Sequence, residues 1–266
     1  MSIVTIDEGP SPLILSMPHP GTQIPGSVHA QLNDVGLAVA DTDWHMRELY
    51  VCAHRFHPTI VEATQSRYVI DLNRDPTGAS LYPGQATTEL VPTTDFDGRP
   101  IWKMPPGEAE IERRKQLYFK PYHDALAAQI ARVKAKHGYC VLYDCHSIRS
   151  HIPRLFPGEL PILNLGTNGG LSCAKSVHDA ASDAAANSGL SHVVNGRFKG
   201  GWITRYYGRP DDHVHAIQME IAQRAYLARE TAPCAFDAAV ARPLRQALDN
   251  ILDSILRAAA ALEGQK

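Results

Sequence analysis

Apolar and polar positions alternate along the chain with two periods, and each period predicts a different kind of element. Short apolar runs predict strands over residues 13–16, 59–63, 68–72, 139–143, 161–165, 191–194 and 215–221. Apolar residues at helical spacing predict helices over residues 37–56, 109–136, 173–188 and 236–262. A further short element at 203–207 follows a glycine-rich bend. Strands that alternate with helices in this way favour an α/β fold.

Two segments depart from this regular pattern. Pro121 lies inside the predicted helix 109–136, so we expect a break or kink there. Residues 78–107 are rich in Pro, Gly and Thr and show little periodicity. Long irregular loops in compact domains are usually lids or binding loops, so we expect an active-site loop here. No shift in composition marks a domain boundary, which predicts a single domain over residues 1–266.

Composition and charge exclude several classes of function. The net charge is −2, with 26 Lys and Arg against 28 Asp and Glu, so nothing in it favours binding to nucleic acid or to an anionic membrane. No apolar run reaches roughly 18 residues, so we expect no membrane span. The acidic N-terminus lacks a secretory pattern, and the five scattered cysteines include no C-x-x-C, which favours a cytoplasmic protein. The sequence carries no signal of an oligomeric state.

Polar side chains gather where the predicted strands end. Ligands of open α/β sheets sit outside the carboxyl ends of the strands, so these positions are candidates for a site. Asp43 joins them from near the start of a predicted helix, and Glu220 stands inside an otherwise apolar strand. The residues at strand ends are His19, Asp71, Asn73, Arg74, Asp144 and His146.

Two neutral imidazoles and one carboxylate are a common ligand set for catalytic zinc, with a fourth position left open for water. His19, Asp43 and His146 would supply this set. Glu220 would act as the base that takes the proton from water and passes it to a leaving amine.

Each assignment has a structural alternative. Asp43 would also serve as a helix N-cap, for which Asp41 competes, and His45 competes as the ligand. Glu220 would also pair with Arg224 or face solvent on an edge strand. Arg67 and Arg74 would also be structural partners of the neighbouring acids Asp71 and Asp75.

Six segments carry a shared pattern: SMPHPG at 16–21, DTDWH at 41–45, SRYVIDLNR at 66–74, YDCHS at 143–147, GGWITR at 200–205 and HVHAIQME at 213–220. Taken together, these segments resemble the N-formylglutamate amidohydrolase family, which is distantly similar to zinc carboxypeptidases and aspartoacylases. The resemblance spans residues 11–226, and the D-L-N-R run at 71–74 looks like the substrate-binding run of aspartoacylases.

The resemblance implies a zinc-dependent amidase with a mixed, mostly parallel sheet flanked by helices, a phosphorylase/hydrolase-like fold of the zinc carboxypeptidase type. It carries over His19 and His146 as metal ligands and Glu220 as the catalytic carboxylate. Asp43 is then the expected third ligand. Carboxypeptidases place their first two ligands as H-x-x-E, whereas the third residue after His19 here is Thr22. Such a site also accepts Co²⁺, Mn²⁺ or Fe²⁺.

The implied reaction is hydrolysis of N-formyl-L-glutamate to formate and L-glutamate, at the end of histidine degradation. The substrate is a dianion, and the guanidinium group is suited to binding carboxylates. The expected substrate-binding residues are Arg67, Asn73, Arg74 and Arg205. The alternatives are a related metal-dependent acylase acting on another N-acyl acidic amino acid, and a non-catalytic protein that binds acidic amino acids.

Overall fold

One mixed sheet organises the part of the chain that the computed structural model describes, residues 2–81 and 83–263. Its strand order is β1-β3-β2-β4-β7-β5-β6. The four strands β3, β2, β4 and β7 run parallel, β1 and β5 pair antiparallel with their inner neighbours, and β6 is parallel to β5. The strands are β1 Val4–Asp7, β2 Leu13–Met17, β3 Thr59–Ala63, β4 Cys140–Ile148, β5 Leu163–Gly166, β6 His192–Val194 and β7 Val214–Ala222.

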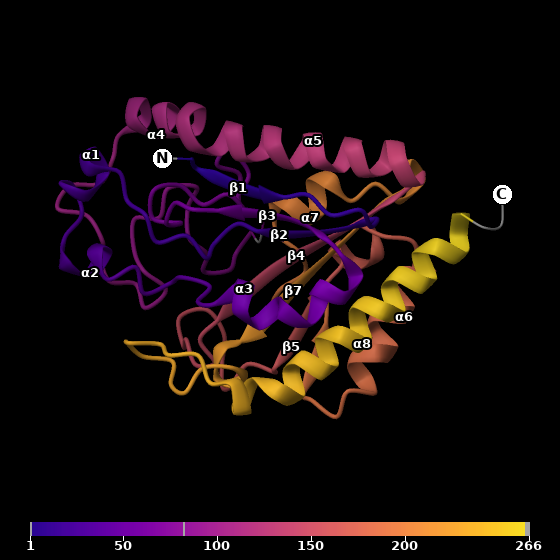
Figure 1. Ribbon diagram of the computed structural model, residues 1–266. Coiled ribbons are helices and arrows are strands. Elements are labelled where there is room, and N and C mark those ends of the chain that lie inside the picture. The colour runs from indigo at the N-terminus through magenta and orange to yellow at the C-terminus, as the bar shows by residue number, and fades with distance from the viewer. Residues whose placement is uncertain (1, 82, 264–266) are drawn as a thin grey trace.

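Helices cover both faces of this sheet (Figure 1). On one face lie α4 Glu108–Arg114, α5 Lys120–His137 and α7 Trp202–Tyr207, and on the other lie α6 Lys175–Ala186 and α8 Ala238–Glu263. Shorter helices connect the elements: α1 Gly26–His29, α2 Asp34–Leu37, α3 Met46–Leu49, and the 3₁₀ turns Tyr50–Phe56, Asn168–Gly170, Pro210–Asp212 and Gln223–Ala225.

The period-2 alternation of the strands divides the interior into two cores. Leu15, Tyr143 and Ile217 pack with α6 and α8 on one face. Ile14 and Leu142, which point the opposite way, pack with α5 and α7 on the other. The two central strands β4 and β7 are buried along their whole length, so anything polar on them lies inside the protein.

Two predicted elements differ from the observed ones, and a third segment had no type assigned. The predicted helix 37–56 is wrong, because the chain adopts left-handed backbone at Val39 (φ 43°) and His45 (φ 55°) and forms only short helical turns. The apolar run 68–72 is not a strand but a buried turn, whose Val69 carbonyl accepts a hydrogen bond from Arg114. Apolar character alone does not separate a strand from a buried turn. The segment 203–207 is part of helix α7.

The predicted break near Pro121 takes the form of a π-helical segment, Lys115–Phe119, between α4 and α5. Proline lacks the N–H that would bond back one turn, and the wider π turn accommodates that loss. The sequence analysis did not predict β1, which pairs with β3 at the edge of the sheet. Both differences leave the layer arrangement intact.

The predicted fold class is confirmed: a single α/β domain with a mixed sheet flanked by helices. No helix among the described residues combines the length and the apolar character needed to cross a membrane.

Packing of α5 on the sheet gives a direct test of this arrangement. Leu126, on the side of α5 that packs in the core, is fully buried, whereas Leu117 in the preceding π segment is 46% exposed. We expect Leu126→Ala to lower the free energy of unfolding by about 2–5 kcal/mol, because it leaves a cavity in the core. The matched control Leu117→Ala should change it by less than about 0.5 kcal/mol. Urea denaturation measures both, and equal effects of the two changes would contradict the packing described here.

Candidate functional site

The candidate site lies at the carboxyl ends of three parallel strands. His19 follows β2 in a turn fixed by prolines on both sides, whereas His146 and Glu220 still belong to β4 and β7. In the register of these strands His146 lies opposite Glu220, and Asp144 lies opposite Gln218. Adjacent parallel strands therefore present a histidine and a carboxylate side by side on the face that carries α5 and α7.

His19, Asp43 and His146 form a buried cluster. Their candidate ligand atoms all lie within 4.8 Å of one another. The two Nδ1 atoms of His19 and His146 are 3.2 Å apart, and Oδ2 of Asp43 lies 3.2 Å from the His146 Nδ1 and 3.7 Å from the His19 Nδ1. Each of the three side chains is at most 3% exposed. The lone pairs of two Nδ1 atoms this close together repel each other unless a proton or a cation lies between them.

Carboxylates hold the outer nitrogen of each histidine. Nε2 of His19 lies 2.8 Å from Asp71, and Nε2 of His146 lies 2.9 Å from Asp144. In the tautomer that donates Nε2–H to the acid, each imidazole directs Nδ1 inward. Metal-binding histidines usually have this arrangement, because the outer acid fixes the tautomer and orients the ring.

The charged groups around the cluster shift one another's pKa values. Although burial opposes its charge, hydrogen bonds from His146 and His19 lower the pKa of Asp43 to about 2. Burial likewise opposes the charge of Asp71, yet Arg74, Arg67 and His19 hold its pKa well below its usual range. Burial also disfavours protonated His146, but the carboxylates of Asp144 and Asp43 hold its pKa well above the usual value. The cluster is thus an anionic setting that favours positive charge between the histidines.

This donor set fits a divalent cation. Two imidazoles and one carboxylate converge from elements far apart in the sequence, and the outer acids hold the rings in place. Oδ1 of Asp43 is buried and accepts no hydrogen bond within the described residues, and Nη1 of Arg67 lies 3.9 Å from it. A buried polar atom without a partner is costly, and a bound ion would satisfy it.

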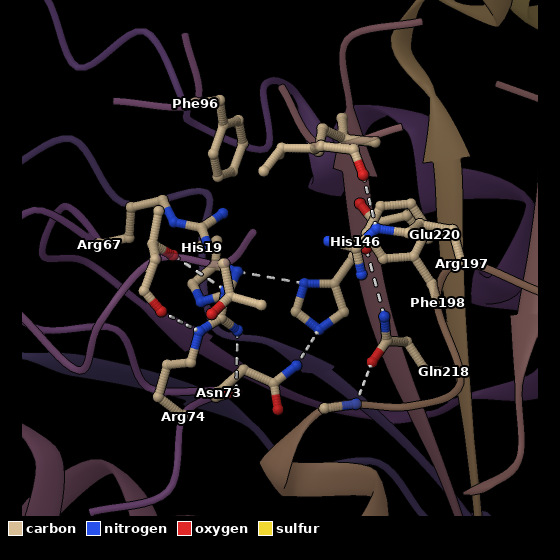
Figure 2. A pocket seen from close by; sticks show the side chains of 15 residues that line it. His19, Arg67, Asn73, Arg74, Phe96, His146, Arg197, Phe198, Gln218 and Glu220 are labelled. Carbon is tan, nitrogen blue, oxygen red and sulfur yellow. Dashed lines mark hydrogen bonds between the residues drawn. The ribbon is translucent and has the colours of Figure 1, made fainter. Parts of the chain in front are cut away.

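Glu220 occupies the cavity wall beside this cluster. It is 7% exposed, and its Oε2 accepts a hydrogen bond of 3.2 Å from Gln218. Gln218 in turn accepts the backbone N–H of Gly201 at 2.6 Å, so the start of α7 positions the pair (Figure 2). Burial raises the pKa of Glu220 to about 7. A carboxyl group with that pKa can both take up and release a proton near neutral pH.

The arginines expected at the site differ in their surroundings. Arg67 donates to Asp71 at 2.6 Å and stacks on Phe96, so buried acids already share its charge. Arg74 lies in the cavity wall and donates to both the carbonyl and the hydroxyl oxygen of Thr88. Arg205 is not among the residues that line the cavity, and it donates to the carbonyls of Gly200 and Leu81.

Asn73 is held from several sides. Its Oδ1 accepts the N–H of Ile203, and its Nδ2 lies 3.1 Å from Asp144 and 2.8 Å from the His146 Nε2. A Cβ at Gly201 would lie 2.4 Å from the Asn73 side chain, so glycine is needed for this close packing. Asn73 therefore links the start of α7 to the acid that orients His146.

A known protein-family model, described as N-formylglutamate amidohydrolase, matches residues 11–227 of the chain. The chain belongs to the N-formylglutamate amidohydrolase family. It is 46% identical over 257 residues to N-formylglutamate deformylase of Pseudomonas aeruginosa and 42% identical to that of Pseudomonas putida, in each case over 96% of both chains. The family resemblance found in the six sequence segments is thereby confirmed.

Solved structures show the same fold. An N-formylglutamate amidohydrolase from Ralstonia eutropha JMP134 aligns with a TM-score of 0.78 at 23% identity, over all of both chains. A gene product of Agrobacterium tumefaciens aligns with a TM-score of 0.74 at 19% identity, over 99% of this chain and 97% of that one.

The structure also decides between the alternatives left by the sequence. Asp43 does not cap a helix: the residue before α3 is His45, whose ring bonds to the Cys234 carbonyl, away from the cluster. Asp41 accepts hydrogen bonds from Tyr68 and from the backbone of Phe96. β7 is an inner strand of the sheet, so Glu220 does not lie at an edge.

Arg224, the partner considered for Glu220, donates instead to Ser150 and to the Leu160 carbonyl.

Several residues of the cavity wall were missed from the sequence. Gln218 was detectable, because it precedes Glu220 by two positions and so shares its face of the strand. Further missed residues lie in loops, where no periodic pattern of apolar and polar positions predicts which side chains face a cavity: Thr87, Thr88, Phe96, Leu155, Arg197 and Phe198.

The cavity between these residues has a volume of about 60 Å³, and a second cavity of about 520 Å³ lies next to it. Arg74, Thr87 and Thr88 line both cavities and form the wall between them. The smaller volume is below that of a typical ligand pocket. A movement of this wall would join the two spaces.

The histidine cluster predicts a specific pattern of metal content. His19→Ala and His146→Ala should each weaken metal binding by more than about 100-fold, since even residues that only orient a ligand contribute 10- to 100-fold. His45→Ala is the matched control and should retain its metal. Elemental analysis of the purified variants, followed by titration with a competing chelator, measures this. Unchanged occupancy in either cluster variant would remove that histidine from the ligand set.

Proposed function

We propose that this chain hydrolyses N-formyl-L-glutamate to formate and L-glutamate in a metal-dependent reaction. The observation that carries the proposal is the pairing of Glu220 with His146 on adjacent strands, beside a buried His19–Asp43–His146 cluster. The substrate comes from the names of the two Pseudomonas relatives. The proposed cellular setting is the cytoplasm, at the end of histidine degradation.

His19, Asp43 and His146 are the proposed ligands of a divalent cation, with Zn²⁺ as the first candidate and Co²⁺ or Mn²⁺ as alternatives. When bound, such an ion acts as a Lewis acid that lowers the pKa of a coordinated water and polarises a carbonyl oxygen. Asp71 and Asp144 keep both imidazoles oriented throughout the reaction.

Glu220 is the proposed proton carrier. It accepts a proton from the attacking water as the new C–O bond forms at the formyl carbon. It then delivers that proton to the amide nitrogen as the C–N bond breaks, so that glutamate leaves as an amine. Gln218 holds the carboxyl group in place for both transfers.

The loop over residues 78–107 is proposed as an active-site loop, because its Thr87, Thr88 and Phe96 belong to the cavity wall. Arg74 is proposed to bind one carboxylate of the substrate. Arg67 is proposed to act at the site mainly by fixing Asp71, and Asn73 by fixing Asp144. Arg205, whose guanidinium donates to the carbonyls of Gly200 and Leu81, is likewise proposed to bind the substrate.

Substitution of Glu220 tests the proton carrier. Glu220→Gln keeps the shape of the side chain but removes its basicity, so kcat should fall about 100- to 10,000-fold while the metal content stays unchanged. Formate release measures kcat, and elemental analysis measures the metal. Glu62, an acid on β3 paired with Arg47 away from the cavity, provides the control Glu62→Gln. Near-normal turnover of Glu220→Gln would refute its role.

Chelation and a substrate panel test the reaction itself. Formate release should stop when the metal is removed and return when Zn²⁺ is added back. N-acetyl-L-glutamate should be cleaved about 10- to 200-fold more slowly than the formyl compound, because the extra methyl group must fit into the small cavity. Equal rates would favour a general acylase. Binding of glutamate derivatives without any formate release would favour a non-catalytic binding protein.

A further inference from the structure

Two buried hydroxyl groups lie next to the acid that orients His146. They belong to Ser16 on β2 and Tyr122 on α5, which are both fully buried and are not among the residues that line the cavity. The other four residues of β2 are apolar, so Ser16 places a polar group where a core residue is expected. A buried hydroxyl is costly unless it is hydrogen-bonded, and its partners therefore indicate its role.

Ser16 holds one oxygen of the Asp144 carboxylate. The two residues lie opposite each other in the register of β2 and β4, and the Ser16 Oγ donates to Oδ1 of Asp144 at 3.0 Å. The other oxygen, Oδ2, lies 2.9 Å from Nε2 of His146 and accepts the amide of Asn73 at 3.1 Å. The carboxylate is thus held at both oxygens, and it cannot rotate away from His146 without breaking the bond to Ser16.

Tyr122 in turn holds the hydroxyl of Ser16. The two hydroxyl oxygens are 3.1 Å apart. Because Ser16 uses its only hydrogen on Asp144, the Tyr122 O–H donates to the Ser16 Oγ and fixes its direction. Tyr122 comes from α5, the helix that packs on β2 and β4. A chain of directed hydrogen bonds therefore runs from a core helix through Ser16 and Asp144 to the ring of His146.

This chain also ties together the two segments that supply the histidines. Ser16 precedes His19 by three residues, and Asp144 precedes His146 by two. The bond between Ser16 and Asp144 thus lies just before the point where the two Nδ1 atoms face each other 3.2 Å apart. A neutral donor orients the acid without adding a positive charge, which would oppose the binding of a cation between the rings.

We propose that Ser16 is a positioning residue of the proposed metal site and that Tyr122 acts through it. Ser16 fixes Asp144, and Asp144 then keeps Nδ1 of His146 directed at Asp43 and His19. This inference rests on the proposed function, in which His146 binds the metal. It extends that function to two residues outside both the ligand set and the cavity wall.

The test compares Ser16→Thr with Ser16→Val, two side chains of nearly the same size of which only threonine keeps the hydroxyl. Any cost of the larger side chain is shared by both variants. Ser16→Val should bind Zn²⁺ about 3- to 30-fold more weakly than Ser16→Thr, somewhat less than the roughly 10- to 100-fold expected for a residue that bonds directly to a ligand. Titration of Zn²⁺ against a competing chelator measures both, and equal affinities would overturn the proposal.

Ser16→Ala adds no atoms, so it keeps the test valid if the larger side chains prevent folding. It should show the same 3- to 30-fold loss, about that of the Val variant, relative to the wild type. The matched control is Ser172→Ala, because Ser172 is also a buried hydroxyl but donates to the Ala216 carbonyl at 2.7 Å. The control should keep its affinity for Zn²⁺ within about twofold. An equal loss in Ser16→Ala and Ser172→Ala would show a general structural effect and overturn the proposal.

A double-mutant cycle tests whether Tyr122 acts through Ser16. Tyr122→Phe alone should weaken Zn²⁺ binding about 2- to 10-fold, the range expected for one neutral hydrogen bond. In the Ser16→Ala background the same change should have no further effect on the affinity, because no hydroxyl is left for Tyr122 to orient. Additive losses, or no loss in Tyr122→Phe alone, would overturn the proposed chain.

Two further measurements separate this proposal from the proposed reaction. The visible absorption spectrum of the Co²⁺-loaded protein reports the geometry around the metal, so it should change in Ser16→Ala and stay the same in Ser172→Ala. An unchanged spectrum in Ser16→Ala would overturn the positioning role. A wild type that binds Zn²⁺ but releases no formate would refute the reaction alone, whereas a wild type that binds no Zn²⁺ would overturn both.

Discussion

The site depends on the way buried acids hold two imidazole rings. Asp71 and Asp144 each take one outer nitrogen, which leaves the two Nδ1 atoms facing each other 3.2 Å apart next to Asp43. These three carboxylates are almost completely buried, where unpaired charge is costly. The arrangement is therefore stable only with positive charge close by, supplied by Arg67 and Arg74, by protons, or by a cation. The same requirement that makes the cluster costly to bury makes it a candidate site for a cation.

The central sheet makes this arrangement possible. Position 146 and position 220 lie on adjacent parallel strands in register, and alternate residues along each strand face α5 and α7. Near the start of β4 this face carries Cys140 and Leu142, whereas toward its end it carries Asp144 and His146. One strand thus contributes to the core with its first half and to the site with its second half. The packed core therefore also holds in place the groups that are proposed to react.

This division explains what the sequence could and could not predict. The central strands, the long helices and the strand-end position of His19 follow local patterns, so they were predicted correctly. Asp43 was proposed as a ligand mainly through the family resemblance, because nothing local distinguishes a ligand from a helix cap. The left-handed backbone at Val39 and His45 interrupts the predicted helix 37–56, and the His45 ring contacts the carbonyl of Cys234, which is distant in the sequence. Similarly, the apolar run 68–72 is buried without pairing in the sheet, and only its contacts with α4 reveal why.

Loops supply the part of the site that the sequence did not predict, and this has a physical reason. Arg197 gains its position from the carbonyls of Ala86 and Leu155, which are distant in sequence and have no periodic pattern. Backbone carbonyls also leave no trace in residue identity, so nothing in the sequence marks these two contacts. Strands β4 and β7 carry His146 and Glu220 in register, so the core holds this pair while loops complete the cavity wall around it.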